Sequence, residues 1–249
     1  MERAGKDRHN KRFTIVGLWG NFILKPPMEE YFQMPEIEDL TMHLSEMLKI
    51  RTAEHTLIRL NSGELAYLSK RFDRTAKNKL QLKDMAQLTG TLTERKYKSS
   101  MGKIGKTILK YSSYPKFDLL TFFELTVFSF LTGNADMHLK NFSLLTNNED
   151  EVMLSPAYDL LSTKLLIPED TEEMALTLNE KKSNLKRRDF DTFAESLQIN
   201  STSVNNSYRK FFSSEPMILE FIDKSFLQPE LKEAYKKLYS EKIEKLKNQ

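Results

Sequence analysis

One polar stretch behind a long apolar run constrains this chain more than any other feature. Residues 122–131 are nearly free of charge and predict the buried part of a helix. Gly133-Asn134, just after this run, is a pair that commonly ends helices. Asp136 follows, and Asn141 comes five positions later. We therefore expect a helix that delivers a polar loop bearing one carboxylate and one amide.

A hairpin is predicted directly after this loop. Residues 142–145 form an apolar, strand-like run, Asn147-Asn148 is a turn signal, and residues 152–154 are short and β-prone. Asp159 follows the second strand. The helix thus delivers the polar loop, and the hairpin delivers a second carboxylate, Asp159.

This combination of groups suits phosphoryl transfer. A carboxylate can orient an acceptor hydroxyl and take its proton, while an amide oxygen and a second carboxylate can hold Mg²⁺ on nucleotide phosphates. Protein kinases space the first two groups as Asp-x-x-x-x-Asn, which is the spacing of Asp136 and Asn141. Lys140 can offset phosphate charge. The spacing alone favours an ordinary surface loop, but the preceding helix and the hairpin leading to Asp159 favour a site.

Both segments resemble one kinase family. Residues 133–145, Gly-Asn-Ala-Asp-Met-His-Leu-Lys-Asn-Phe-Ser-Leu-Leu, resemble the catalytic loop of HipA-type serine/threonine kinases, which are toxins of bacterial toxin–antitoxin modules. Residues 154–162, Leu-Ser-Pro-Ala-Tyr-Asp-Leu-Leu-Ser, resemble their metal-binding segment. The roles that the resemblance implies are catalytic base for Asp136, Mg²⁺ ligand for Asn141 and Asp159, and support of the loop for His138 and Lys140.

The amino-terminal part predicts a hairpin that ends in Lys25. Residues 13–16 and 21–25 are β-prone, and Pro26-Pro27 ends the second strand. A lysine at a strand end is usually just solvated, but the strand lysine of kinases reaches nucleotide phosphates. The family has a similar Phe-Ile-Leu-Lys-Pro strand that carries its ATP lysine, so the resemblance implies this role for Lys25.

A helix is predicted next. Pro35 suits a first turn, and apolar residues recur at helical spacing from Ile37 to Leu48. Glu38, at the edge of that apolar face, either favours the positive end of the helix dipole or pairs with Lys25, as in kinases. The family's pattern Asn-Glu-Asp-Leu-Thr-Met-His-Leu supports the pairing, although Ile37 replaces its Asn.

Backbone amides of a glycine-rich turn can bind phosphate, but Gly17-Leu-Trp-Gly20 matches such a loop poorly and predicts a hairpin turn. In the family the phosphate loop lies upstream, in a segment resembling Gly-Val-Gln-x-Lys, where this chain has only Arg3-Ala-Gly-Lys6. We therefore expect a missing or degenerate phosphate loop, a chain truncated or split at its amino terminus relative to the family, and weak activity of the chain alone.

Residues 56–60 and 65–70 predict another hairpin around the turn Asn61-Ser-Gly63. The resemblance places the hinge between two lobes after it. The resemblance implies that backbone groups of Lys70 to Phe72 bind adenine and that Asp73 lies near the ribose. It also implies that Gln87, in a helix expected at residues 82–88, reaches towards the ribose. From the residues alone, Phe72 is a core side chain.

Helices are also predicted at residues 189–197, 215–222 and 229–247. Ser214 is expected to cap the second of them. Residues 160–178 hold the place of a kinase activation segment, but an ordinary loop is the simpler interpretation.

Composition fits an intracellular enzyme, and we expect a cytoplasmic location. The 249 residues can bury a real core, no cysteine is present, and the net charge of +3 does not indicate a nucleic-acid binder. The start lacks the apolar region of a signal peptide, and no window predicts a membrane span. The four histidines show no metal-ligand spacing, and for two of them the sequence favours ordinary helix-surface or loop positions: His43 and His55.

The predicted architecture is α+β and bilobal, as in HipA-type kinases. A strand-rich lobe at residues 1–73 and a helical lobe at residues 74–249 together form one HipA-like domain, with ATP in the cleft.

The leading interpretation of function is an ATP- and Mg²⁺-dependent protein serine/threonine kinase. Known members of the family phosphorylate aminoacyl-tRNA synthetases and are held inactive by a DNA-binding antitoxin. The resemblance thus implies a protein substrate of that kind, an antitoxin or amino-terminal partner chain, and contact with DNA only through the antitoxin.

Two alternatives stay open. A pseudokinase, which binds nucleotide or a partner chain without catalysis, would explain a degenerate phosphate loop. A lipid or small-molecule kinase is a third possibility, because the loop does not specify the acceptor.

Overall fold

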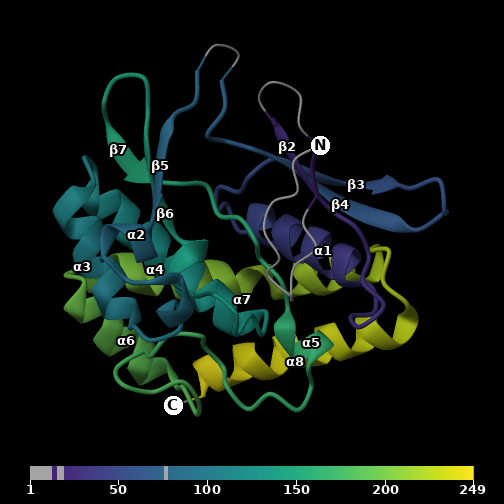
Figure 1. The fold of residues 1–249 in the computed structure, drawn as a ribbon. Coiled ribbons are helices and arrows are strands. Elements are labelled where there is room, and N and C mark those ends of the chain that lie inside the picture. Colours follow the sequence, from purple (N-terminus) through teal and green to yellow (C-terminus); the bar gives the residue numbers. More distant parts are fainter. Residues whose placement is uncertain (1–12, 16–19, 76–77, 249) are drawn as a thin grey trace.

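Two antiparallel sheets organise the computed structural model, which describes residues 13–15, 20–75 and 78–248 (Figure 1). The first sheet has the strand order β1-β2-β4-β3 and the second the order β5-β6-β7. The strand bounds are β1 (Phe13–Ile15), β2 (Phe22–Lys25), β3 (His55–Arg59), β4 (Leu65–Lys70), β5 (Gln81–Asp84), β6 (Ser143–Thr146) and β7 (Val152–Leu154).

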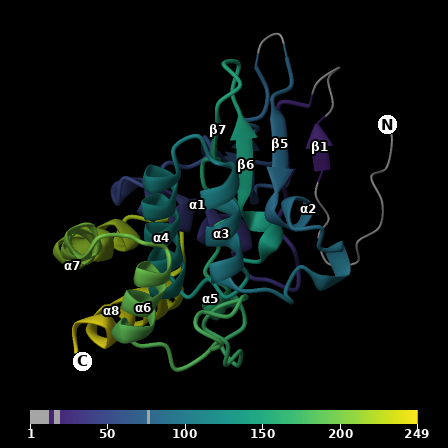
Figure 2. The same cartoon turned by 90° about the vertical axis from the view of Figure 1, so that its left-hand side faces the viewer.

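Helices lie below and beside the second sheet and line one side of the first (Figures 1 and 2). The α-helices are α1 (Met34–Met47), α2 (Met85–Leu88), α3 (Met101–Tyr111), α4 (Pro115–Leu131), α5 (Thr163–Leu166), α6 (Arg187–Ser196), α7 (Ser201–Asp223) and α8 (Pro229–Lys247). Two short 3₁₀ turns are η1 (Thr93–Arg95) and η2 (Leu139–Asn141). None of the helices in the described part of the chain is long and apolar enough to cross a membrane.

The first sheet contains both hairpins that the amino-terminal sequence predicts. Phe13 pairs with Leu24 across β1 and β2, and Lys25 at the end of β2 pairs with Tyr67 on β4. Helix α1 packs against β3 and β4 and buries the apolar face that its sequence predicts. Glu38 lies fully within the buried face and not at its edge, which differs from the prediction.

The second sheet corrects the helix that was expected at residues 82–88. Leu82 pairs with Leu145 across β5 and β6, and helix α2 begins only at Met85. Residues 81–84 alternate between exposed and partly buried positions, so pairing with β6 decides this segment over helical propensity. The hairpin β6–β7 is as predicted, with Leu144 opposite Leu154.

A single long helix, α7, replaces the short helix expected at residues 215–222. It begins after Asn200, whose side chain caps it by accepting from the Ser203 amide, and it contains Pro216 in its interior. The prediction that Ser214 caps a helix is therefore wrong. The Ser/Asn-rich first half has low helix propensity, but it buries Tyr208 and other side chains, and this packing outweighs the local preference.

The core is centred on α4, which packs against β7, α3, α7 and α8. Four of its aromatic side chains, Phe122, Phe123, Phe128 and Phe130, are completely buried, whereas Phe117 in its first turn is exposed. Phe122 meets Phe193 of α6 edge to face with ring centroids 5.8 Å apart. Such contacts add to the burial of large apolar area. Helix α4 is thus held from several sides, which fixes the loop that follows it.

Candidate functional site

The end of α4 sets the starting point of the polar loop. Gly133 has φ +64°, and its amide donates to Phe130 while the Asn134 amide donates to Ser129. This pair of bonds is a Schellman motif, which favours glycine at the left-handed position. A Cβ at Gly133 would come within 2.8 Å of Leu238 and 2.9 Å of Lys164, so both conformation and space require glycine.

Local hydrogen bonds then shape the loop around Asp136. The buried Asn134 accepts from the Asp136 amide at 3.1 Å, and the His138 amide donates to the Asp136 carbonyl at 2.8 Å. Thr163 of α5 accepts from the Ala135 amide at 2.8 Å and so joins the loop to the segment after Asp159. The backbone of the loop is therefore fixed at both ends, and the Asp136 carboxylate remains half-buried.

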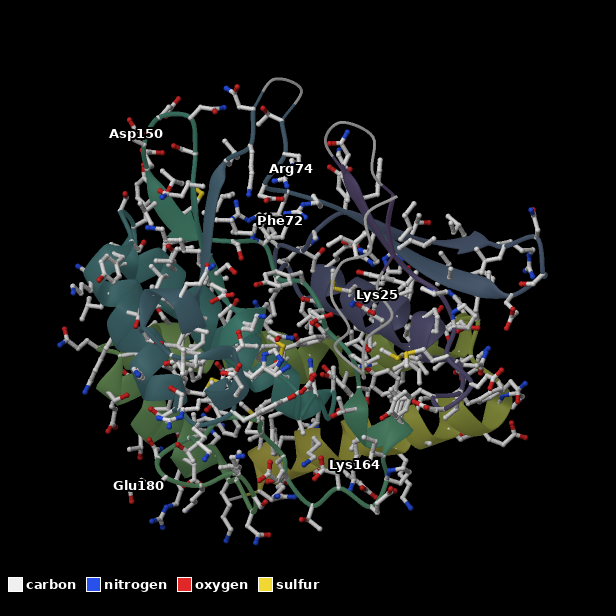
Figure 3. The ribbon with its side chains drawn as sticks, in the orientation of Figure 1. Lys25, Phe72, Arg74, Asp150, Lys164 and Glu180 are labelled. Carbon is white, nitrogen blue, oxygen red and sulfur yellow. The ribbon has the colours of Figure 1, made fainter. Side chains whose placement is uncertain are left out.

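Four of the predicted residues meet in one cluster. The Lys25 ammonium contacts the carboxylates of Glu38 and Asp159, and Asn141 Nδ2 donates to Asp159 Oδ2 at 3.1 Å. Figure 3 shows Lys25 between the first sheet and α1. The structure thus brings together residues from a strand, a helix, the loop and the segment after the hairpin.

Asp159 adopts an unusual backbone conformation, with φ +61°. Asp tolerates the left-handed region better than most residues, at a cost that the surroundings must offset. The neighbouring residues supply such support: Ala157 exchanges backbone hydrogen bonds with Arg51 and Ala53, and Tyr158 donates to the Lys140 carbonyl at 2.8 Å. This conformation aims the Asp159 carboxylate at Asn141 and Lys25.

The donor set fits a hard divalent cation. Asn141 uses its amide nitrogen toward Asp159, which leaves its amide oxygen as an acceptor. A carboxylate beside an amide oxygen matches the oxygen ligands that Mg²⁺ prefers. The neighbouring Lys25 ammonium, with only 14% of its side chain exposed, is a cation suited to phosphate oxygens.

His138 and Lys140 both lie in the loop, in different settings. His138 is buried and meets the ring of Tyr97 edge to face at 5.0 Å. Burial lowers the pKa of His138 below its ordinary value, against the opposing charge of Asp136, so its imidazole is neutral at neutral pH. Lys140 is half-buried and contributes its carbonyl to Tyr158.

The hinge residues lie where the chain passes from the first sheet to the second (Figure 3). The amide of Lys70 donates to Glu54 and that of Arg71 to Asn21, each at 2.8 Å. Those two amides are therefore engaged, and the adenine-binding prediction rests on the other backbone groups of Lys70 to Phe72. The ring of Phe72 lies 5.5 Å from that of Tyr158.

Asp73 is held by two guanidinium groups. Arg71 makes two hydrogen bonds to its carboxylate at 2.8 and 2.9 Å, and Arg74 makes a third at 2.5 Å. Burial would raise the pKa of Asp73, but these bonds and charges outweigh it and hold the pKa below its ordinary value. With its carboxylate bound in this way, Asp73 positions the hinge through Arg71 and Arg74.

Gln87 has a structural role at the start of α2. Its side chain accepts from the Asp84 amide at 3.0 Å, and the Asp84 side chain accepts from the Gln87 amide at 2.8 Å. This reciprocal arrangement is a capping box. To reach a ribose, as predicted, the Gln87 side chain would have to give up its hydrogen bond in this cap.

One residue of the site was missed by sequence reasoning. The Tyr97 hydroxyl donates to Asp136 Oδ1 at 2.6 Å. Burial raises the pKa of Tyr97 well above its ordinary range, and the hydrogen bond to Asp136 raises it further. Tyr97 precedes Asp136 by 39 residues in a basic stretch, and no local signal marks it.

Most of the residues considered for a phosphate loop, Arg3–Lys6 and Gly17–Trp19, lie outside the described residues.

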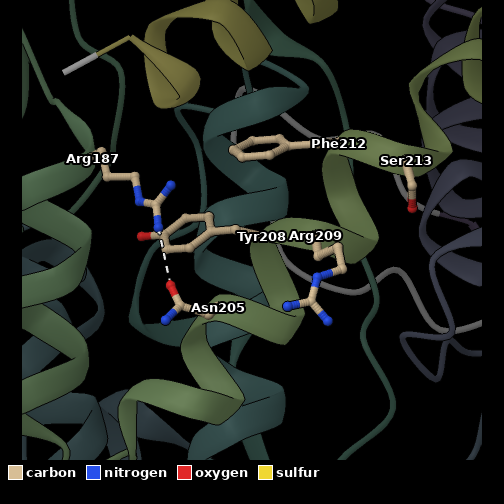
Figure 4. A pocket seen from close by; sticks show the side chains of 6 residues that line it. All are labelled: Arg187, Asn205, Tyr208, Arg209, Phe212 and Ser213. Atoms are coloured by element: carbon tan, nitrogen blue, oxygen red, sulfur yellow. Dashed lines mark hydrogen bonds between the residues drawn. The ribbon is translucent and has the colours of Figure 1, made fainter.

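A separate pocket lies on α6 and α7, where the Arg187 guanidinium stands 3.9 Å from the centre of the Tyr208 ring (Figure 4). None of the predicted site residues lines it.

Comparison with known proteins agrees with this geometry. The model of the HipA-like C-terminal domain matches residues 13–217. The chain belongs to this family. A candidate kinase of Sinorhizobium fredii, Y4dM, is 33% identical to this HipA-like chain over 207 residues, which is 78% of the chain and 50% of the relative. A candidate kinase of Haemophilus influenzae is 28% identical over 228 residues, 80% of the chain and 65% of the relative.

Solved structures share the fold of this HipA-like chain. HipA of Shewanella oneidensis, in a complex with HipB and operator DNA, matches with a TM-score of 0.78 and 19% identity over 91% of this chain and 58% of that one. The Helicobacter pylori proinflammatory kinase CtkA matches with a TM-score of 0.65 and 19% identity over 90% and 87% of the two chains. The chain spans about half the length of the first curated relative. The α+β, HipA-type fold expected from the sequence is confirmed.

Proposed function

We propose that this chain is a HipA-type protein kinase that transfers the γ-phosphoryl group of ATP to a serine or threonine hydroxyl in an Mg²⁺-dependent reaction. The observation that supports this most strongly is the cluster in which Lys25 contacts Glu38 and Asp159 while Asn141 binds Asp159. Phosphoryl transfer depends mainly on positioning and charge stabilisation, and this cluster offers both.

Asn141 and Asp159 would hold Mg²⁺, which neutralises charge on the phosphates when bound. When Mg²⁺ binds, the contact between Lys25 and Asp159 would break and the contact between Lys25 and Glu38 would stay, so that the Lys25 ammonium faces phosphate oxygens. Glu38 is 1% exposed, so its charge has little solvent to screen it and fixes the direction of Lys25.

Asp136 would accept the proton of the substrate hydroxyl and orient it for attack. Its Oδ1 is bound by Tyr97, so a substrate hydroxyl would replace the tyrosine or use the second oxygen. Lys140 would offset negative charge in the loop, and His138, neutral and buried, would support Tyr97 and the loop backbone. The adenine would bind at backbone groups of Lys70 to Phe72.

The partners follow from the family. The Shewanella HipA structure contains HipB and operator DNA, so we propose an antitoxin partner, with DNA contacted only through it. A translation-related protein such as an aminoacyl-tRNA synthetase is the proposed substrate, in the cytoplasm.

The test is phosphoryl transfer by purified protein with radiolabelled ATP, alongside calorimetric titration of Mg·ATP. Asp136→Asn should abolish transfer, since general bases contribute about 10²–10⁴-fold, and leave the affinity for Mg·ATP near that of the wild type. Asp159→Ala should weaken Mg·ATP binding more than binding of ATP in EDTA. Retained transfer by Asp136→Asn would refute the assignment of the loop.

A nucleotide-binding module without catalysis is the second candidate. It is favoured by the hydrogen bond that occupies Asp136 Oδ1 and by the contact of Lys25 with Asp159. Mg·ATP binding that depends on Asp159, without transfer to any protein in a lysate of the host, would identify this function instead.

A further inference from the structure

A second polar cluster lies where α1 meets β3, separated from Lys25 by the ring of Tyr67, which is near both Lys25 and His55. Asp39 and His43 are one helical turn apart on α1, and His55 comes from β3. One ligand atom from each of the three residues can be chosen so that all lie within 4.8 Å of one another. The two imidazole rings have centroids 4.4 Å apart.

The Nδ1 atoms of both histidines are already used. His43 Nδ1 lies 3.2 Å from a Glu46 carboxylate oxygen, and His55 Nδ1 lies 3.2 Å from the Ala53 carbonyl. Both partners only accept hydrogen bonds, so Nδ1 is the donor in each pair. In a neutral imidazole this leaves the lone pair on Nε2. Metal-binding histidines commonly have this arrangement, with the second nitrogen fixed by a carboxylate or a carbonyl.

Two of the atoms that face the centre of the cluster have no hydrogen-bond partner among the residues that the structure describes. His43 Nε2 is 3.6 Å from Asp39 Oδ2, and His55 Nε2 is 3.9 Å from Asp39 Oδ1, both beyond hydrogen-bond range. Asp39 Oδ1 and His55 Nε2 are buried and have no hydrogen-bond partner among the described residues. Only 1% of the His55 side chain is exposed, which contradicts its interpretation as a surface residue. Unpaired buried polar atoms are costly, and here two of them point to the same place.

We propose that Asp39, His43 and His55 bind a divalent transition-metal ion, with Zn²⁺ as the occupant. Two imidazoles and one carboxylate suit Zn²⁺ better than Mg²⁺ or Ca²⁺, which prefer oxygen. In a tetrahedral site with bonds of about 2.0–2.1 Å, ligand atoms are separated by about 3.3 Å, so small side-chain rotations close the cluster. His43 is 37% exposed, which gives the ion an entry path and leaves a fourth position for water.

Outer contacts of the cluster fit this role. Thr52 donates to Glu46 at 2.7 Å and so fixes the carboxylate that orients His43. The rings of Tyr67 and Phe221 flank the histidines, with centroids 5.8 Å from His55 and 5.9 Å from His43. The ion would join α1 to β3 and hold the helix that carries Glu38.

The experiment uses the full chain, freed of any affinity tag and treated with EDTA. Zn²⁺ binding is measured by competition with a chromogenic chelator, and Co²⁺ is added as a spectroscopic probe of the ligand geometry. We expect one Zn²⁺ per chain, a visible Co²⁺ spectrum typical of tetrahedral nitrogen and oxygen ligands, and an increase in Tm of about 5–10 °C at a hundredfold excess of free Zn²⁺ over its Kd. Mg²⁺ should give neither effect.

Matched variants separate this site from adventitious binding. Glu46 orients a ligand without binding the ion, so Glu46→Gln should weaken Zn²⁺ binding by about 10–100-fold. His43→Gln and Asp39→Asn each remove a ligand and should weaken it by more than about 100-fold. His9→Gln removes a histidine outside the described residues and should bind Zn²⁺ as the wild type does. Since His43 is partly exposed, its variant should keep the wild-type Tm in EDTA.

The proposal fails if the wild type binds no Zn²⁺ below micromolar concentrations, or if His43→Gln and Asp39→Asn bind it as tightly as the wild type. These measurements need no phosphoryl transfer, so they stand whether or not the chain is a kinase.

Discussion

The loop after α4 and the region around α1 hold their polar side chains in different ways. In the loop, Asp136 is positioned by bonds among near neighbours, such as the one from its own amide to Asn134. Around α1, Lys25 contacts residues 13 and 134 positions away. The loop should therefore be most sensitive to substitutions that change the backbone conformation. The region around α1 should be most sensitive to substitutions that remove a charge.

The largest expected effect tests the ion pairs around α1. Lys25→Met leaves the buried Glu38 and the partly buried Asp159 without their shared cation. Breaking one side of a buried pair costs about 3–5 kcal/mol, and we expect a loss of this size in the free energy of unfolding by urea. Lys70→Met is the matched control: Lys70 pairs with Glu54 on the surface, and its loss should cost less than about 1 kcal/mol. Equal losses would contradict the distinction between the two pairs.

Backbone conformation in the loop is tested by Gly133→Ala. The left-handed conformation costs about 1–2 kcal/mol for a residue with a Cβ, and the close approach to Leu238 and Lys164 adds overpacking. We expect a total of about 2–4 kcal/mol by chemical denaturation. Gly63→Ala, at φ +89° with no neighbour within 4 Å of the added Cβ, should show the conformational cost alone. If the two variants lose the same stability, the packing at Gly133 does not matter.

The pH dependence of stability tests the charged hinge around Asp73. The pKa of Asp73 is lower in the folded than in the unfolded chain, so the unfolded state binds its proton more readily. The stabilisation by Arg71 and Arg74 is therefore complete above the unfolded pKa of about 4 and is lost as the pH falls through the folded value. At pH 7, Asp73→Asn should cost about 1.5–3 kcal/mol.

Unfolding of wild type and variant from pH 7 to pH 2 provides the measurement. The difference between them should be constant near neutrality and shrink below about pH 4. Asp150→Asn, which changes an exposed carboxylate at a left-handed position, serves as the control and should show no such trend. A difference that grows toward low pH would reverse the sign of the argument.

The smallest effect concerns the long-range hydrogen bond from Tyr97 to the Asp136 carboxylate. Tyr97→Phe removes the hydroxyl bound to Asp136 and should cost about 0.5–1 kcal/mol. In a double-mutant cycle with Asp136→Asn, most of this cost should disappear. Tyr111→Phe changes a similarly exposed ring and should not couple to Asp136. An additive cycle for Tyr97 would mean that its hydrogen bond contributes nothing.

Sequence reasoning correctly predicted what depends on neighbours along the chain. The uncharged run, Gly133-Asn134 and the strands that follow predict the helix, its end and the hairpin, because capping and turn geometry involve only a few consecutive residues. The same local rules failed where packing competes with propensity. Residues 81–84 became a strand by pairing with β6, and the first half of α7 became helical by burying its apolar side chains.

Only the tertiary structure decided which distant side chains meet. His43 and His55 show no ligand spacing in the sequence, yet α1 and β3 bring their rings to 4.4 Å, and Tyr97 reaches Asp136 from a basic stretch without a motif. Such contacts depend on how whole helices and strands pack together, and a short window of consecutive residues carries no information on that packing. The order of residues along this chain therefore determined the loop and its Asp136–Asn141 spacing. The packing of α1 against the first sheet determined which charged side chains and histidines meet around that helix, because those contacts join segments that only the fold brings together.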